Sequence, residues 1–339
     1  MSKLLVIVGI TGNQAGSVAE AFLKDPTWKI RGTSRDPSKP ESQAIAAKGI
    51  EMVHGNVDDV TSLKEAFKGA NVIFGNTAFN IAPVIVTTDA DRAKLKPNQT
   101  IREYCHDLEV QQGKNIADAA ATVGDSLELF IWSSLSDVKK WSKGKYNSVY
   151  HFDSKAAVVD YIREKYPELA KKMSLLQMGF FMTNWRWGQP AVPWEKRPDG
   201  SMLLRIPGDG NMPVPLLLPS DAGAFAKALT QLPPGKNIIA YGDLMTWEEF
   251  VKLWSKTTGV PATFEKVTVA DHEKLAPGGY GEEMAEMYAY AQDYGYWGGD
   301  DQSVVFTKDL GIDVKATRVK DYIKNEDWSE LLSRPVPGS

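Results

Sequence analysis

The segment VIVGITGNQAG, residues 6–16, decides the fold because an apolar strand runs directly into closely spaced glycines and then into an amphipathic helix. Gly9 permits a tight turn, and Gly12 lets the backbone approach a pyrophosphate. The small pair Ala15 and Gly16 allows the helix to pack closely on the strand, so that its N-terminal N–H groups face an anion. The segment therefore predicts a nucleotide-binding turn; the alternative is a turn that only packs well.

The same strand begins an alternation of short apolar runs and helix-length amphipathic segments that continues to about residue 179. This alternation is typical of a parallel sheet with crossover helices. The expected strands are residues 4–8, 28–33, 51–54, 72–75, 129–133 and 174–178. The expected helices are residues 15–24, 40–48, 60–67, 101–123 and 150–166. We therefore predict an α/β fold with a doubly wound parallel (Rossmann) sheet.

The rhythm changes after residue 179 to Trp- and Pro-rich segments with single strands and isolated helices. A chain of 339 residues also exceeds what one hydrophobic core usually supports. We predict a dinucleotide-binding Rossmann domain at 1–179 and a smaller C-terminal α/β substrate lobe at 180–339, with allowance for segments that return to the Rossmann sheet. Residues 78–99 form an unusually long connection, which indicates either a functional lid or loose surface.

Composition and charge narrow the function classes. The chain has 39 Lys and Arg against 43 Asp and Glu residues, a net charge of −4, so no overall positive field attracts nucleic acid. The lone Cys105 cannot form an internal disulfide, and no apolar run approaches the roughly 20 residues of a membrane span. The four His residues lack metal-site spacing. We expect a cytoplasmic protein with a small-molecule partner and no metal, nucleic acid or membrane contact; the oligomeric state stays open.

The residues after the second expected strand decide which nucleotide fits. At this position a carboxylate holds a ribose 2′-hydroxyl, whereas a cation accepts a 2′-phosphate. Arg35, with Lys39 nearby, favours the phosphate and therefore NADP(H). Asp36 is the alternative, a carboxylate for the ribose diol, although an Asp before Pro37 is also a turn-former.

Six motifs in the first 180 residues occur in an order that resembles a known family. They are GITGNQAGSV (9–18), SRDPSKP (34–40), GNVDDVTSLKEAFKGANVIF (55–74), EVQQGKNIADAA (109–120), FIWSSL (130–135) and HFDSKAAVVDYI (151–162). Together they resemble the NmrA-like family of atypical short-chain dehydrogenases/reductases. The resemblance implies an NADP(H)-binding Rossmann domain and a small C-terminal lobe, with the substrate cleft between them.

The resemblance also implies which residues contact the dinucleotide. Those expected at the pyrophosphate are Gly9, Thr11, Gly12, Asn13, Gln14 and Gly16. Arg35 and Lys39 would contact the 2′-phosphate, and Asn56 and Val57 the adenine edge. Those expected on the nicotinamide side are Asn76, Thr77, Ser133 or Ser134, and Lys155. Two features depart from the family pattern: Asn56 replaces the usual Asp, and the segment after Thr77 is longer than usual.

The candidate catalytic residues depart from the pattern of the wider superfamily, because the usual Tyr is missing. Ordinary members of the wider superfamily place a Tyr four residues before a Lys on one helix face, where the cation lowers the pKa of the phenol. Counting back from Lys155 gives His151, and Tyr150 lies about 140° round the helix from Lys155. We take Lys155 and His151 as candidate catalytic residues; a solvated Lys and a packed His are the alternatives.

Two functions follow from the resemblance. The first is an NADPH-dependent oxidoreductase that acts on a small, fairly apolar organic substrate, for example in secondary metabolism. The second is a non-catalytic NADP(H) redox sensor and transcriptional co-regulator that acts through protein–protein binding. Trp185, Trp187 and Trp194 follow the sixth expected strand and could serve an aromatic substrate or pack between the lobes.

Overall fold

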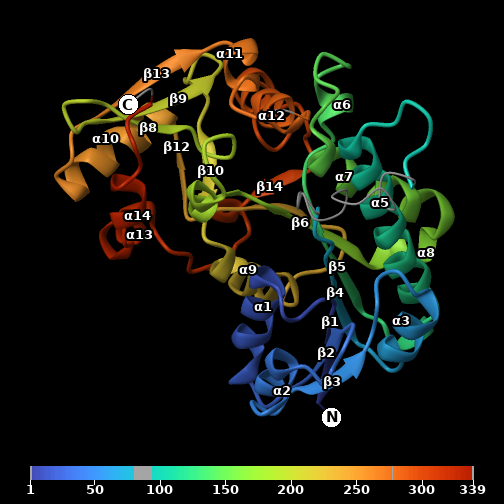
Figure 1. The fold of residues 1–339 in the computed structure, drawn as a ribbon. Coiled ribbons are helices and arrows are strands. Elements are labelled where there is room, and N and C mark those ends of the chain that lie inside the picture. The colour runs from blue at the N-terminus through green and yellow to red at the C-terminus, as the bar shows by residue number, and fades with distance from the viewer. Residues whose placement is uncertain (1, 80–93, 277, 338–339) are drawn as a thin grey trace.

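The computed structural model describes residues 2–79, 94–276 and 278–337. Its centre is an eight-stranded sheet with the order β14-β11-β6-β5-β4-β1-β2-β3 (Figure 1). Every neighbouring pair of strands in this sheet is parallel. The predicted doubly wound parallel α/β fold is confirmed. The strands are β1 (Lys3–Ile7), β2 (Trp28–Ser34), β3 (Glu51–His54), β4 (Val72–Gly75), β5 (Leu129–Ser134), β6 (Met173–Met178), β11 (Asn237–Ala240) and β14 (Val304–Phe306).

Helices cover both faces of the sheet because successive side chains of each strand point to opposite faces. Leu5 of β1 belongs to the same buried cluster as Phe22 of α1, whereas its neighbour Val6 belongs to the cluster of Phe67 of α3. Figure 1 shows α1 and α9 on one side of the sheet and α3, α5, α7 and α8 on the other. These helices are α1 (Asn13–Leu23), α3 (Val60–Phe67), α5 (Ile101–Ala120), α7 (Tyr150–Lys165), α8 (Pro167–Lys172) and α9 (Ala222–Leu229), and α2 (Pro40–Ala46) joins β2 to β3.

The elements expected within residues 1–179 are confirmed. Each of the six strands agrees within one residue at either end, and the ends of the five helices differ by at most three residues. Helix α1 begins two residues earlier than expected, at Asn13, because Gly12 is extended and serves as the N-cap. Helix α5 begins where expected because Thr100 and Glu103 form a capping box. The long connection expected at 78–99 lies mostly outside the described residues.

The C-terminal part of the chain is built around aromatic side chains. Trp185, Trp194, Trp247, Trp254 and Trp328 belong to one buried cluster. Around it lie two three-stranded sheets, β12-β10-β7 and β13-β9-β8. The strands are β7 (Phe180–Phe181), β8 (Trp194–Lys196), β9 (Met202–Pro207), β10 (Val214–Leu217), β12 (Asp243–Met245) and β13 (Ala262–Val267). The helices are α10 (Trp247–Thr258), α11 (Val269–Glu273), α12 (Tyr280–Tyr294), α13 (Val319–Asn325) and α14 (Ser329–Leu332).

Segments from beyond residue 180 complete the main sheet. Strands β11 and β14 extend it past β6, and α9 packs on α1. The contact between the two helices is very close at Gly223, where a Cβ would lie 2.1 Å from the backbone oxygen of Ser17. The N–H group of Gly223 also donates to Ser17 Oγ at 3.0 Å. The C-terminal half of the chain thus fixes the helix that carries the glycine turn; the domain boundary itself stays a prediction.

None of the helices in the described part of the chain combines the length and the apolar character that crossing a bilayer requires.

Candidate functional site

The glycine turn leaves the N-terminus of α1 open. Gly9 has a φ of +63°, a conformation that favours glycine, and its N–H group donates to Thr33 Oγ1 at 3.1 Å. Gly12 donates to the backbone oxygen of Gly9 at 2.9 Å, and no side chain of the described residues caps the helix. Thr11, Gly12 and Asn13 are exposed. The first N–H groups of α1 therefore face outward, as binding of a pyrophosphate requires.

Polar side chains at the ends of β4 and β5 lie beside this turn. Ser133 of β5 donates to Oε1 of Gln14 at 2.9 Å and so connects the sheet edge to α1. Asn76, directly after β4, holds a buried Oδ1 that has no hydrogen-bond partner among the described residues. A buried acceptor without a partner is costly unless a ligand satisfies it. Together with the uncapped helix terminus, it makes this edge fit a nicotinamide dinucleotide.

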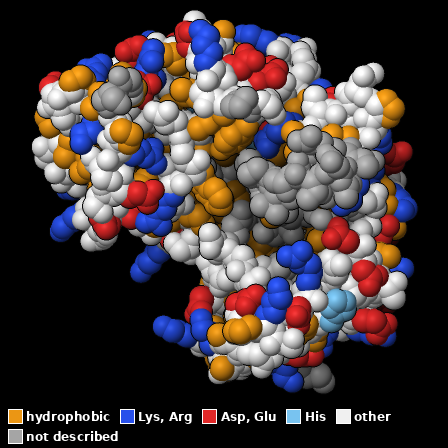
Figure 2. Space-filling model, viewed as in Figure 1, with side chains coloured by type: hydrophobic (Ala, Val, Ile, Leu, Met, Phe, Trp, Pro, Cys, Tyr) orange, Lys and Arg blue, Asp and Glu red, His pale blue; other side chains and the backbone are white. Residues whose placement is uncertain are grey.

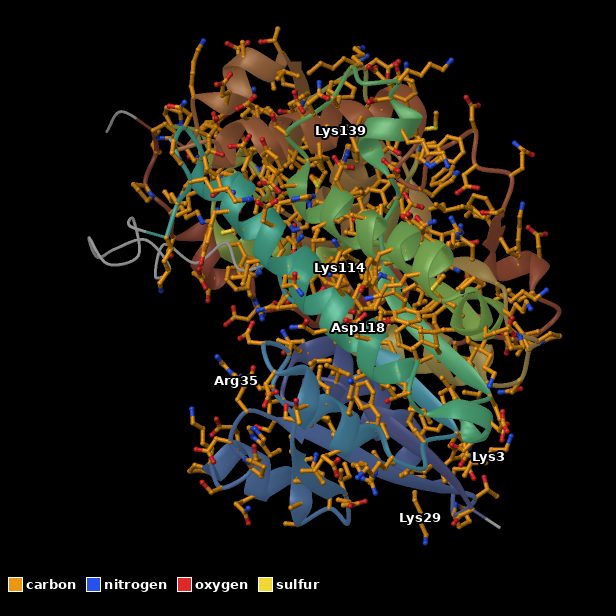
Figure 3. The ribbon with its side chains drawn as sticks, turned by 90° about the vertical axis from the view of Figure 1, so that its right-hand side faces the viewer. Lys3, Lys29, Arg35, Lys114, Asp118 and Lys139 are labelled. Atoms are coloured by element: carbon orange, nitrogen blue, oxygen red, sulfur yellow. The ribbon has the colours of Figure 1, made fainter. Side chains whose placement is uncertain are left out.

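At the end of β2, the structure separates the roles of Arg35 and Asp36. The carboxylate of Asp36 accepts from the backbone N–H of Ser38 at 2.9 Å and from its hydroxyl at 2.6 Å, which is a turn-forming arrangement and lowers the pKa of Asp36. Arg35 is exposed, and Figure 3 shows its side chain pointing away from the molecule. Lys39, also exposed, precedes α2 as its N-cap. The cation rather than the carboxylate is therefore available to a ligand here.

The loop after β3 carries the residues expected at the adenine edge, and α5 holds it. The N–H group of Asn56 donates to Ser62 Oγ, and the Val57 oxygen accepts from Asn115 Nδ2, both at 2.9 Å. Gln112, three residues before Asn115 and so on the same helix face, donates to Asp58. The sequence analysis missed Asn115. No sequence signal singled it out, because Asn115 stands among other polar residues of α5 such as Gln111, Lys114 and Asp118.

Lys155 is buried and its ammonium group is fully engaged. Its Nζ lies 2.9 Å from Glu109 Oε1, 3.0 Å from the Thr77 oxygen and 3.2 Å from Thr77 Oγ1. Glu109, on α5, is 2% exposed and also accepts from the hydroxyl of Ser154. An ammonium group has three N–H donors, so each has an acceptor within the protein. Contact with a ribose or substrate therefore requires Lys155 to exchange one of these bonds.

His151 lies one helical turn before Lys155 and faces a different carboxylate. Its Nδ1 is 2.5 Å from Oε1 of Glu283, a buried residue of α12. The ring also lies 6.0 Å from that of Phe79, which follows β4 by a few residues. Tyr150 instead packs edge-on against His106, on α5. The structure thus places His151, and not Tyr150, beside the segment that leaves β4.

The aromatic residues after β6 divide into core and surface. Trp185 donates to the hydroxyl of Tyr322 at 2.9 Å, and Trp194 packs against Trp254 with ring centroids 4.9 Å apart. Both are buried, and these contacts pack them on aromatic residues of the C-terminal part of the chain rather than between the two predicted lobes. Trp187 is 74% exposed.

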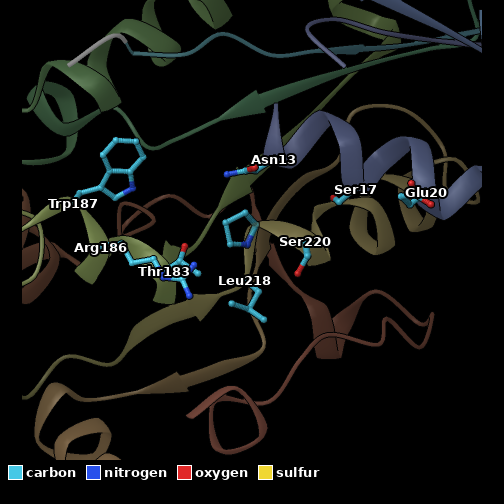
Figure 4. Close-up of a pocket in the computed structure, with 9 residues that line it drawn as sticks. Asn13, Ser17, Glu20, Thr183, Arg186, Trp187, Leu218 and Ser220 are labelled. Atoms are coloured by element: carbon cyan, nitrogen blue, oxygen red, sulfur yellow. The ribbon is translucent and has the colours of Figure 1, made fainter. Parts of the chain in front are cut away.

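Trp187 lines a cavity of about 590 Å³ that Asn13, at the start of α1, lines as well (Figure 4). Thr183 and Leu218 border the same cavity. In the space-filling view, hydrophobic side chains gather around the hollow at the centre of the visible face (Figure 2). The other residues that line the cavity include Ser17, Glu20, Arg186 and Ser220, so its wall is mixed, with Trp187 and Leu218 among mostly polar side chains.

The parallel sheet and the glycine turn at the start of α1 define a Rossmann-type fold. The family model described as "NmrA-like family" matches residues 1–332, and the chain belongs to that family. One relative is an NmrA-like family domain-containing oxidoreductase of Penicillium ochrochloron, ptmS, which is 24% identical; the match covers 97% of this chain and 95% of the relative.

Solved structures show the same fold. The negative transcriptional regulator NmrA in complex with NAD matches with a TM-score of 0.70 at 19% identity, over 96% of this chain and 95% of the other. NmrA has also been solved in complex with NADP. The NADPH-dependent quinone oxidoreductase QOR2 of Escherichia coli, complexed with NADPH, matches with a TM-score of 0.65 at 18% identity, over 94% and 98% of the two chains.

The buried pair of Lys155 and Glu109 yields a test of stability. Lys155→Ala should lower the free energy of unfolding by about 3–5 kcal/mol because it leaves a buried carboxylate without its charge partner. The double variant Lys155→Met with Glu109→Leu should recover most of this loss. Lys68→Ala, which breaks an exposed pair with Glu65, is the control and should have little effect. Urea denaturation measures all three; a loss for Lys155→Ala no larger than the control would contradict the role of the pair.

Proposed function

We propose that this chain is an NADP(H)-dependent oxidoreductase that acts on a small, fairly apolar organic substrate. The observation that carries the proposal is the open N-terminus of α1 beside the exposed Arg35, a combination suited to a dinucleotide with a 2′-phosphate. The oxidoreductase name of the Penicillium relative and the NADPH held by the quinone oxidoreductase support the reaction class. The NADP(H) domain would comprise residues 1–179 and the substrate lobe residues 180–339, except that β11, β14 and α9 return to the Rossmann sheet, in a cytoplasmic protein.

The bound nicotinamide would supply or accept a hydride. The chain's own contribution is to hold the dinucleotide at the ends of β1, β4 and β5 through Gln14, Asn76 and Ser133. His151 is the group best suited to exchange a proton, since its ring lies beside Phe79 at the same edge. Lys155 would fix Thr77, through its bonds to both oxygens of that residue, and so shape the nicotinamide side.

One observation favours the alternative, a redox sensor that binds a regulatory protein. The three donors of Lys155 all have acceptors within the protein, so the usual cation of this superfamily is not poised for proton transfer. The fold is also that of the regulator NmrA. A sensor needs the dinucleotide site but no proton-exchanging group.

Cofactor preference tests the 2′-phosphate site. NADPH should bind more tightly than NADH, and Arg35→Ala should reduce this preference tenfold or more, because a charge-assisted hydrogen bond to the phosphate is lost. Lys29→Ala is the matched control, since Lys29 is an exposed cation at the other end of β2 (Figure 3). Isothermal titration calorimetry measures both affinities. Equal affinity of the unaltered protein for the two cofactors would contradict the assignment.

Turnover separates the oxidoreductase from the sensor. In single-turnover assays with enones, imines and aromatic ketones, the protein should oxidise NADPH with at least one substrate class. His151→Gln should slow that step about a hundredfold, as expected for loss of a positioned acid/base group, without weakening NADPH binding. His106→Gln is the control. Tight NADPH binding without oxidation of any of these substrates would favour the sensor.

A further inference from the structure

Glu283 is a buried carboxylate at the contact between three helices. It belongs to α12, and its side chain has no exposed surface. Oε2 accepts from Nε of Arg102 at 2.5 Å and also from Nη2 of the same residue on α5. Oε1 accepts from the backbone N–H of His151 at 3.0 Å and lies 2.5 Å from its Nδ1. Each carboxylate oxygen therefore has two partners, contributed by α5 and α7.

This arrangement determines which nitrogen of His151 carries the proton. A carboxylate paired with a guanidinium has only acceptors to offer, so the imidazole nitrogen that faces it must be a donor. That nitrogen is Nδ1. In the neutral ring Nε2 is then the acceptor, because one nitrogen carries the proton and the other does not.

Burial and two neighbouring cations favour the neutral form of the ring. Burial, together with the positive charges of Arg102 on α5 and Lys155 on α7, lowers the pKa of His151. The charged groups that face the ring from the three packed helices are thus two cations and the Glu283 carboxylate. Arg102 is itself held between the rings of Phe79 and Tyr280, with its guanidinium 4.8 and 5.4 Å from their centroids. The carboxylate cannot leave His151 without breaking this group of contacts.

We propose that Glu283 is a positioning residue that holds His151 with its proton on Nδ1, so that Nε2 exchanges the proton of the reaction. The proposal rests on the proposed function. In the oxidation direction, the substrate C–H bond gives a hydride to the nicotinamide of NADP⁺, and the adjacent O–H or N–H bond gives its proton to Nε2. The electron pair of that bond completes the C=O or C=N double bond. The imidazolium so formed is paired with Glu283, and reduction runs the same steps in reverse.

A purely structural role for Glu283 makes a different prediction. The carboxylate also accepts from the backbone N–H of His151 in the first turn of α7, and so caps that helix. A cap alone would stabilise α7 but would not determine the tautomer of the ring. The protonation state of the two ring nitrogens therefore distinguishes positioning from capping.

Nitrogen NMR of the protein labelled with ¹⁵N-histidine measures this state without any substrate. At neutral pH, His151 should carry its proton on Nδ1. In Glu283→Gln the amide oxygen should turn toward Arg102, because two fixed N–H donors of Arg102 face that position and only one fixed donor, the backbone N–H of His151, faces the other. The amide NH₂ should then face the ring of His151. Nδ1 must become an acceptor, so the proton should move to Nε2. Glu282→Gln is the matched control. The carboxylate of Glu282 accepts from the hydroxyl of Ser148 and not from His151, so this substitution should leave the tautomer of His151 unchanged.

Glu283→Asp keeps the charge and provides a second variant in case Glu283→Gln does not fold. It should retain protonated Nδ1. With any substrate that is turned over, Glu283→Gln should lower kcat at least tenfold at unchanged NADPH affinity, and Glu283→Asp should recover part of the loss. A proton on Nε2 in the unaltered protein, or on Nδ1 in folded Glu283→Gln, would overturn the proposal. NADPH titration tests the proposed function separately. If NADPH does not bind, the proposed function fails, but the tautomer of His151 measured in the free protein still tests the role of Glu283.

Discussion

The open N-terminus of α1 at the sheet reversal is the constraint on which the site depends. The strand order runs outward in both directions from the adjacent strands β1 and β4, so the connections on either side leave a crevice at their carboxyl ends. Helix α1 starts at this crevice, and Gly223 of α9 holds it there through backbone contact with Ser17. In the proposed site, the residues at the ends of β2, β4 and β5 would contact the dinucleotide because α1 presents its N–H groups beside them.

Two buried carboxylates hold the side chains of α7 that the proposed function uses. Lys155 pairs with Glu109, and His151 pairs with Glu283. Two residues one turn apart on α7 thus contact two different buried carboxylates. Such buried charges are costly unless paired, and both pairs gain further hydrogen bonds from Ser154 and Arg102. Lys155 therefore binds Thr77 after β4, whereas the proposal assigns proton exchange to the ring nitrogen of His151 that does not face Glu283.

The sequence predicted the elements that are determined locally. The strands of the first 179 residues are apolar runs with turn residues at their ends, and the glycine turn has a fixed spacing, so both were found. The sequence also placed His151 and Lys155 one turn apart on α7. Their partners could not be predicted, because Glu109 and Glu283 are 46 and 132 residues away along the chain. Strands β11 and β14 were not assigned individually, because they lie beyond residue 179, where the regular alternation of apolar runs and amphipathic helices has ended; only the return of some segments to the sheet was anticipated.

A crystal structure of the protein with NADP⁺ tests the central claim most directly. We expect the pyrophosphate at the N–H groups that open α1, the 2′-phosphate within hydrogen-bond distance of Arg35, and a donor of the dinucleotide at the buried Oδ1 of Asn76. A dinucleotide bound elsewhere, or one bound with its 2′-phosphate remote from Arg35 and with Asn76 Oδ1 still lacking a partner, would contradict the account.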